Sequence, residues 1–203
     1  MYELLRIVFK TIFSLVFRWQ VSGAENIPAG GVIIAANHIS LWDPPLVGTA
    51  LPRRIHFMAK QELFANPLFG WIITRLGAFP VKRGAADRTA IRTALTLLAA
   101  GSALGIFPEG TRSKTGALGS PEPGLALLAL KSGAPVVPAA IIGTNKVFSA
   151  GHLLPRFQII FGKPLQFSKD NSGKETMEAM SMRVMTEISR LLSAASQPED
   201  RQG

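Results

Sequence analysis

The chain has 203 residues, of which 47% are hydrophobic and 17% charged, with a formal net charge of +9 and no cysteine. This length suits one domain with a sizeable core, and the low content of charged residues excludes a disordered chain and favours a protein that covers part of its surface with lipid. The absence of cysteine excludes disulfides, thiolate zinc sites and cysteine nucleophiles, while the positive charge favours anionic partners.

Residues 1–20 are predicted to form an amphipathic helix that lies in the membrane interface. Polar residues recur there every three or four positions and fall on one narrow stripe, while apolar residues cover the rest. Lys10 interrupts the apolar run that a transmembrane span or a secretory signal needs. A helix buried in the protein core is the alternative. The polar stripe consists of Glu3, Arg6, Lys10, Ser14 and Arg18.

Short apolar runs alternate with helix-like stretches along the rest of the chain. This alternation predicts a single α/β domain over residues 21–195, with a mainly parallel central sheet flanked by helices, and a polar tail at 196–203. The expected strands are 32–36, 55–59, 103–107, 136–142 and 157–161. The expected helices are 67–76, 87–100, 124–132 and 174–192, the second capped by Asp87.

A polar segment, Asn-His-Ile-Ser-Leu-Trp-Asp at residues 37–43, directly follows the first of these strands. Asp43 could reach back to the imidazole of His38, fix its tautomer and leave the other ring nitrogen to accept a proton. Taken alone, the pair is weak evidence for catalysis, and a structural histidine held by a loop carboxylate is the favoured interpretation. Ser40 lacks the Gly-x-Ser-x-Gly turn of a nucleophile, and the segment offers no further ligands for a metal.

A second segment, Phe-Pro-Glu-Gly-Thr-Arg-Ser at residues 107–113, follows another predicted strand. Gly110 allows the backbone to approach a ligand closely, and Thr111 and Arg112 supply donors suited to a phosphate. A surface loop with an ion pair at Glu109 is the alternative. Further cationic candidates for phosphate binding, each also compatible with a solvated turn, are Lys60, Lys82 and Arg83. Pro138, in an apolar run, marks a sheet edge, a bulge or a strand start.

Together these segments resemble the glycerolipid acyltransferase family, which includes bacterial 1-acyl-sn-glycerol-3-phosphate acyltransferases. Four family patterns occur in order between about residues 21 and 162. They are Asn-His-x4-Asp at 37–43, Gly-x-Phe-x-x-(Lys/Arg)-Arg at 77–83, Phe-Pro-Glu-Gly-Thr-Arg-Ser at 107–113, and an apolar Val-Pro at 137–138.

The resemblance implies an enzyme that moves an acyl chain from acyl-CoA or acyl carrier protein to the 2-hydroxyl of lysophosphatidic acid, giving phosphatidic acid. His38 would be the general base and Asp43 its orienting partner. No metal or other cofactor is expected. The implied phosphate-binding residues are Glu109, Gly110 and Arg112, assisted by Arg83, and the residues themselves add Thr111 and Lys60 as candidate substrate contacts.

One segment departs from the family pattern. Family members often carry Phe-Lys-x-Gly where this chain has Pro-Glu-Pro-Gly at residues 121–124. Another lysophospholipid or a lyso-aminolipid is therefore an alternative acceptor, and a non-catalytic basic membrane-binding protein is a second alternative. The expected location is the cytoplasmic face of the cell membrane, peripheral or monotopic, on an anionic surface. Nucleic acid is not an expected partner, because basic clusters interleaved with aromatic residues are missing.

Overall fold

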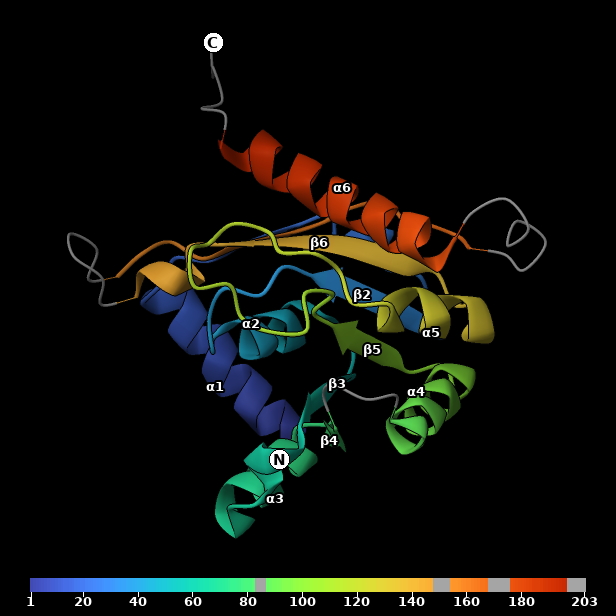
Figure 1. Ribbon diagram of the computed structural model, residues 1–203. Coiled ribbons are helices and arrows are strands. Elements are labelled where there is room, and N and C mark those ends of the chain that lie inside the picture. Colours follow the sequence, from blue (N-terminus) through green and yellow to red (C-terminus); the bar gives the residue numbers. More distant parts are fainter. Residues whose placement is uncertain (83–86, 148–153, 168–175, 197–203) are drawn as a thin grey trace.

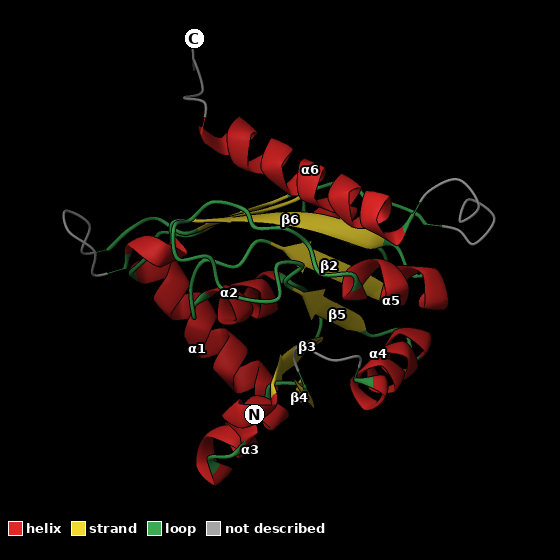
Figure 2. Cartoon of the chain, in the orientation of Figure 1, coloured by secondary structure: helices red, strands yellow, loops and turns green. Residues whose placement is uncertain are grey.

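The computed structural model describes residues 1–82, 87–147, 154–167 and 176–196. Their helices and strands alternate along most of the chain (Figure 2). The α-helices are α1 (Tyr2–Leu15), α2 (Asp43–Ala50), α3 (Pro67–Arg75), α4 (Arg88–Ala99), α5 (Gly124–Ser132) and α6 (Met177–Ser196). The strands are β1 (Gln20–Ser22), β2 (Val32–Ala36), β3 (Ile55–Lys60), β4 (Ala78–Val81), β5 (Ala103–Ile106), β6 (Val136–Ile142) and β7 (Gln158–Phe161). Short 3₁₀ turns are η1 (Ala24–Asn26), η2 (Gln61–Phe64) and η3 (Thr144–Lys146).

The strands form one sheet in the order β1-β7-β6-β2-β5-β3-β4. Every neighbouring pair is parallel except β6 and β7. The prediction of a single α/β domain with a mainly parallel sheet is therefore confirmed. All five residues of β2 are buried, as expected of a central strand covered on both faces.

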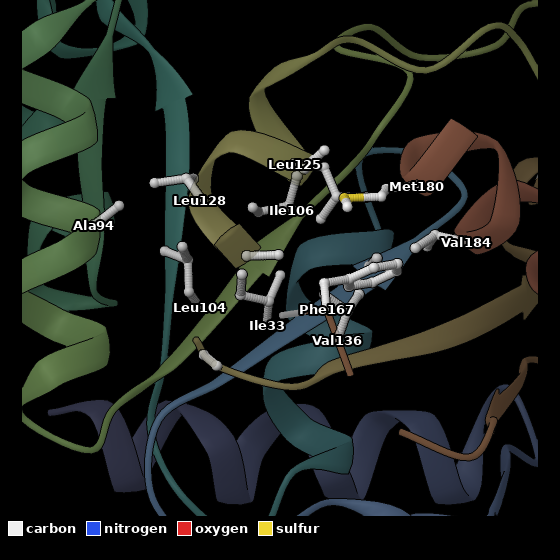
Figure 3. Packing of buried hydrophobic residues seen from close by; sticks show 14 of the residues in the cluster. Ile33, Ala94, Leu104, Ile106, Leu125, Leu128, Val136, Phe167, Met180 and Val184 are labelled. Carbon is white, nitrogen blue, oxygen red and sulfur yellow. The ribbon is translucent and has the colours of Figure 1, made fainter. Parts of the chain in front are cut away.

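Two hydrophobic clusters lie on opposite faces of the sheet, because successive side chains of a strand point to opposite sides. Val32, Ile34 and Ala36 of β2 pack with residues of α1 and α2. Ile33 and Ala35 pack with residues of α4, α5 and α6 (Figure 3). The sheet is thus the middle layer, with α1 and α2 on one side and α4, α5 and α6 on the opposite side (Figure 1).

The N-terminal helix is shorter than predicted. It ends at Leu15, and Gln20 already pairs with Gln158 in the sheet. A positive φ of 43° at Arg18 turns the chain into β1, and the buried ring of Phe17 stacks on Phe157 at 4.1 Å. Aromatic packing into the core, which helical periodicity does not reveal, therefore ends the helix early.

The two faces of α1 have different environments. Phe13 is fully buried in the core, so one face behaves as the core-helix alternative anticipated. Leu4 and Ile7 are 65% and 60% exposed, so another apolar face remains uncovered. No helix in the described ranges is both long and apolar enough to cross a bilayer.

Three other elements differ from the predictions. A strand, β4, was not expected and ends at Val81, directly before the basic candidates Lys82 and Arg83. Asp43 begins a helix, α2, that was not expected either. The last helix reaches Ser196, which had been placed in the polar tail, while residues 174–175 and 197–203 lie outside the described part of the chain. The expected cap of α4 is confirmed, since the Asp87 side chain accepts hydrogen bonds from the N–H groups of Thr89 and Ala90.

Pro138 lies inside β6, an interior strand, opposite an irregularity in its neighbour. Ala139 pairs with Phe161, whereas Val136 bridges to Leu165, so the partner segment contains one extra residue. The bulge alternative for Pro138 is thus correct and the edge alternative is wrong. At a bulge the ring nitrogen, which cannot donate, does not break a regular ladder.

Candidate active site

Three adjacent parallel strands, β5, β2 and β6, end at the same edge of the sheet. The segment that follows β2 carries His38, the segment after β5 carries residues 107–112, and the turn after β6 carries Thr144. Ligands of open α/β sheets bind at the carboxyl ends of the strands. Segments far apart in the sequence therefore converge at one site.

His38 and Asp43 form the hydrogen bond that their spacing predicted. Nδ1 of His38 lies 2.8 Å from Oδ2 of Asp43, whose side chain is fully buried, while the His38 side chain is 12% exposed. A carboxylate oxygen can only accept, so the proton of the neutral ring lies on Nδ1. The Nε2 atom then has a lone pair that can accept a proton from a substrate.

The carboxylate of Asp43 is held by four donors. Besides His38, the backbone N–H groups of Ile39 and Ser40 each donate to Oδ2 at 2.7 Å. The hydroxyl of Thr144 donates to Oδ1 at 2.6 Å. These hydrogen bonds fix the buried carboxylate, and the carboxylate in turn orients the imidazole.

The segment after β2 is fixed to β6 and to β5. The Asn37 side chain donates to the carbonyl of Ile141 at 2.9 Å and accepts from the Ile141 N–H at 2.7 Å. The ring of His38 stacks on Phe107 with centroids 4.1 Å apart. These contacts restrict the position and tilt of the imidazole, which proton transfer to a bound substrate requires.

Glu109 holds two backbone segments together. Its Oε1 accepts from the His38 N–H at 3.0 Å, and its Oε2 accepts from the Gly119 N–H at 2.9 Å. The residue is only 8% exposed. In this structure Glu109 therefore acts as a positioning residue for His38, while its implied contact with a glycerol phosphate stays a prediction.

Gly110, Thr111 and Arg112 form the turn beside this pair. Gly110 has a φ of 67°, a conformation that suits glycine, and Thr111 and Arg112 are exposed. The next residue, Ser113, donates its N–H to the carbonyl of His38 at 2.8 Å, which joins this segment to the backbone of His38.

A cavity of about 730 Å³ adjoins Phe107 and this turn. Its walls are mainly apolar side chains from β3, α4, β5 and α5, and its charged members are Lys82, Asp87 and Glu122. Hydrogen bonds from the N–H groups of Ala90 and Lys82 lower the pKa of the Asp87 carboxyl, which caps α4 at the cavity wall. The apolar members include Met58, Ile91, Ile106, Leu125, Leu127 and Leu128.

The remaining predicted cations are distributed differently. Lys60 ends β3 and lies 3.3 Å from the carboxylate of Glu62, both exposed. Arg83 lies outside the described residues, next to Lys82 of the cavity wall. No cluster of three potential metal-binding side chains occurs within the described ranges.

Comparisons with known proteins agree with this geometry. The family described as Acyltransferase matches residues 18–142, more than half of the chain. The chain belongs to the acyltransferase family. A 1-acyl-sn-glycerol-3-phosphate acyltransferase of Bacillus subtilis is 36% identical over 170 residues, which cover 81% of this chain and 82% of that protein.

Two further relatives of this acyltransferase bear on fold and acceptor. The crystal structure of the 1-acyl-sn-glycerophosphate acyltransferase PlsC from Thermotoga maritima matches all of the chain and 81% of its own, with a TM-score of 0.77 and 28% identity. A lyso-ornithine lipid O-acyltransferase of Pseudomonas aeruginosa is 36% identical over 129 residues, covering 63% of this chain and 48% of that protein.

Two features of the site were not predicted from the acyltransferase sequence: Thr144 and the clamping role of Asn37. Thr144 follows β6 by two residues, and only the adjacency of β6 to β2 brings it to Asp43. Gly143, with a φ of 88°, was the available indication of a tight turn at that strand end.

Proposed function

We propose that this acyltransferase transfers an acyl chain from acyl-CoA or acyl carrier protein to the 2-hydroxyl of lysophosphatidic acid. The observation that carries the proposal is the hydrogen bond between His38 Nδ1 and Asp43 Oδ2, which leaves the lone pair of Nε2 to accept a proton. The backbone carbonyl of His38 accepts from the N–H of Ser113, the neighbour of Arg112 in the chain. The names of the Bacillus and Thermotoga relatives support this acceptor.

In this mechanism Nε2 of His38 takes the proton of the acceptor hydroxyl as its oxygen attacks the thioester carbonyl. A tetrahedral oxyanion forms and then collapses, breaking the carbon–sulfur bond. The imidazolium returns the proton to the thiolate, so that an ester and a free thiol leave the enzyme. The buried Asp43 carboxylate stabilises the imidazolium in between.

The surroundings offer a place for each part of the substrates. The apolar cavity next to Phe107 has a size typical of small-molecule sites and suits an acyl chain. Gly110, Thr111 and Arg112 supply backbone space and exposed donors for the phosphate. Arg83, adjacent to the cavity residue Lys82, would add a second cation.

The protein would work as a peripheral or monotopic protein on the cytoplasmic face of the cell membrane. The exposed apolar side chains of α1, such as Leu4 and Ile7, and the net charge of +9 support binding to an anionic leaflet.

The test is acyl transfer by the purified full-length protein in mixed micelles, with acyl-CoA and acyl carrier protein as alternative donors. Lysophosphatidic acid should yield phosphatidic acid with release of one thiol per ester. His38→Ala should lose this activity by orders of magnitude while keeping its melting temperature. Near-normal turnover by His38→Ala would refute the assignment of the base, and absence of transfer to any phosphorylated lysolipid would refute the acceptor.

A lyso-aminolipid is the second candidate acceptor. Glu122, which stands where the family often has lysine, lies over the turn: a Cβ at Gly110 would come within 3.0 Å of its Cγ. A carboxylate at this place repels a phosphate and attracts an amine. The likeness to the lyso-ornithine lipid O-acyltransferase supports this candidate. Transfer to a phosphate-free aminolipid in the same assay, with none to lysophosphatidic acid, would favour it.

A further inference from the structure

Helix α3 is an apolar helix that the protein does not bury. Only Gly70 of its nine residues is buried, whereas α5, of equal length, buries four. Scattered exposed apolar residues are ordinary, but a contiguous group of large ones indicates a contact with a partner or a membrane. The exposed group on η2 and α3 consists of Leu63 (44%), Leu68 (69%), Phe69 (45%) and Trp71 (50%).

The way in which α3 is attached explains this exposure. Gly70 lies against the backbone of η2, and a Cβ there would come within 3.0 Å of the Phe64 carbonyl oxygen. The Asn66 side chain accepts from the Phe69 N–H at 3.0 Å, with Pro67 at the first helical position. The helix is therefore capped and held through its backbone while its large side chains face outward.

Two arginines, Arg54 and Arg75, lie at the end of α3, and Arg54 connects it to the start of α1. The guanidinium of Arg54 lies 5.4 Å from the ring centre of Tyr2 and donates to the carbonyl of Arg75 at 3.1 Å. Arg75 in turn lies 5.1 Å from the ring centre of Trp71. The N-terminus of the chain and α3 accordingly appear next to each other (Figure 1). The start of α1 and the end of α3 are thus linked through Arg54.

We infer that η2 and α3 form a second membrane contact, beside α1, with the aromatic side chains among the headgroups of an anionic bilayer. The surface combines large apolar side chains with the exposed cations Arg54 and Arg75, in a chain of net charge +9. Trp and Arg at the end of an apolar segment are typical of the membrane interface. This composition fits a lipid surface better than a protein partner.

The contact rests on the proposed function in one respect, because it would bring the lipid acceptor to the site. Strand β3 ends at Lys60 and η2 starts at Gln61, at the sheet edge where His38 also lies. Lipid bound at η2 and α3 would therefore lie near the carboxyl edge of the sheet rather than at its far end.

The absence of cysteine allows a direct test on the full-length protein. The single variants Leu68→Cys, Leu4→Cys and Met182→Cys are each labelled with an environment-sensitive fluorophore. Met182, on α6 across the sheet, is 49% exposed and serves as the matched control. Each protein is mixed with vesicles of phosphatidylcholine alone or with phosphatidylglycerol.

The expected result is a blue-shifted, brighter emission at Leu68 and Leu4 with the anionic vesicles, and no change at Met182. A change in emission at Leu4 without one at Leu68 would overturn the inference and leave α1 as the anchor. Unchanged emission at all three positions would overturn it as well. An equal response to pure phosphatidylcholine would overturn the anionic partner. A shifted emission at Leu68 without vesicles, with the mass of a dimer, would show that a second copy covers the helix.

Variants provide an independent readout. Leu68→Ser combined with Trp71→Ser should weaken binding to anionic vesicles roughly tenfold, whereas Met182→Ser should not. The same double variant should keep its turnover of a short-chain acceptor dissolved below its micellar concentration. Vesicle binding does not depend on turnover, so the two proposals can fail separately. If the parent protein transfers no acyl chain to a phosphorylated lysolipid but still binds vesicles through Leu68, the proposed acceptor is refuted and the membrane contact stands.

Discussion

The hydroxyl of Thr144 donates a 2.6 Å hydrogen bond to Oδ1 of Asp43, and both residues are buried. They are 101 positions apart in the chain and meet because β6 lies beside β2. Oδ2 already accepts three hydrogen bonds, so Thr144 is the donor that satisfies the other oxygen. The structure thus adds a third side chain to the predicted pair.

Thr144→Val should lower kcat roughly tenfold and leave KM for both substrates nearly unchanged. The valine keeps the volume but removes a hydrogen bond to a charged group, a contribution of about 1.5–3 kcal/mol, and the freed carboxylate can rotate away from His38. Steady-state kinetics together with thermal unfolding is the measurement. Thr144→Ser, which retains the hydroxyl, should restore most of kcat; equal losses in both variants would show that only packing matters.

Glu109→Gln should lower the melting temperature and kcat rather than raise KM for the acceptor. An amide has one acceptor oxygen, so the N–H of His38 or of Gly119 loses its partner, at a cost of about 1–3 kcal/mol. Glu122→Gln, an exposed neighbour, is the matched control for stability. A selective rise in KM at unchanged stability would instead assign Glu109 to substrate binding.

The sequence predicted the residues of the site better than their arrangement. His38 and Asp43 could be identified because local spacing determines their contact, and the His38–Asp43 bond is confirmed. Apolar runs likewise revealed the strands that are buried on both faces. Local pattern also identified Asp87 as a cap, because a cap needs only neighbours along the chain.

Contacts that depend on strand order could not be predicted. Nothing in the sequence indicates that β6 pairs with β2, and without this pairing neither Thr144 nor the clamp from Asn37 to Ile141 can be foreseen. The short strand β4 was missed because it has only four residues, contains Pro80 and lies at the edge of the sheet. The hydrogen bonds from the backbone of His38 and of Gly119 to Glu109 also depend on the fold, while its contact with the substrate, implied by the family resemblance, stays a prediction.

Between pH 7 and pH 5 the protein should lose part of its stability through His56. Desolvation and the nearby Arg54 lower the pKa of His56 below 6.5, while its hydrogen bond to the Gly77 carbonyl opposes the shift. As the pH falls below about 6.5, the unfolded state takes up a proton that the folded state does not, so the free energy of unfolding decreases until the pH reaches the folded-state pKa.

His56→Asn keeps a donor near the Gly77 carbonyl and removes this proton uptake. Urea unfolding at several pH values measures the free energy of unfolding. Between pH 7 and pH 5 this free energy should decrease less for the variant than for the parent protein. If the free energy of unfolding of the variant decreases with falling pH as steeply as that of the parent, a group other than His56 causes the loss of stability. Met182→Gln, a substitution at an exposed position of α6, should have the same pH dependence of the free energy of unfolding as the parent.

Glu122→Lys should raise kcat/KM for lysophosphatidic acid roughly fivefold, mainly through KM. The side chain lies over Gly110 and lines the cavity beside Thr111, so the substitution replaces a repulsive charge next to the phosphate by an attractive one. The site is exposed, which limits the gain to that of a solvated ion pair. Glu122→Gln, which only removes the negative charge, should show a smaller gain in the same direction. If the natural acceptor is an aminolipid, both variants should instead lose activity towards it. Measuring kcat/KM for the two acceptors in parallel therefore shows which headgroup Glu122 selects.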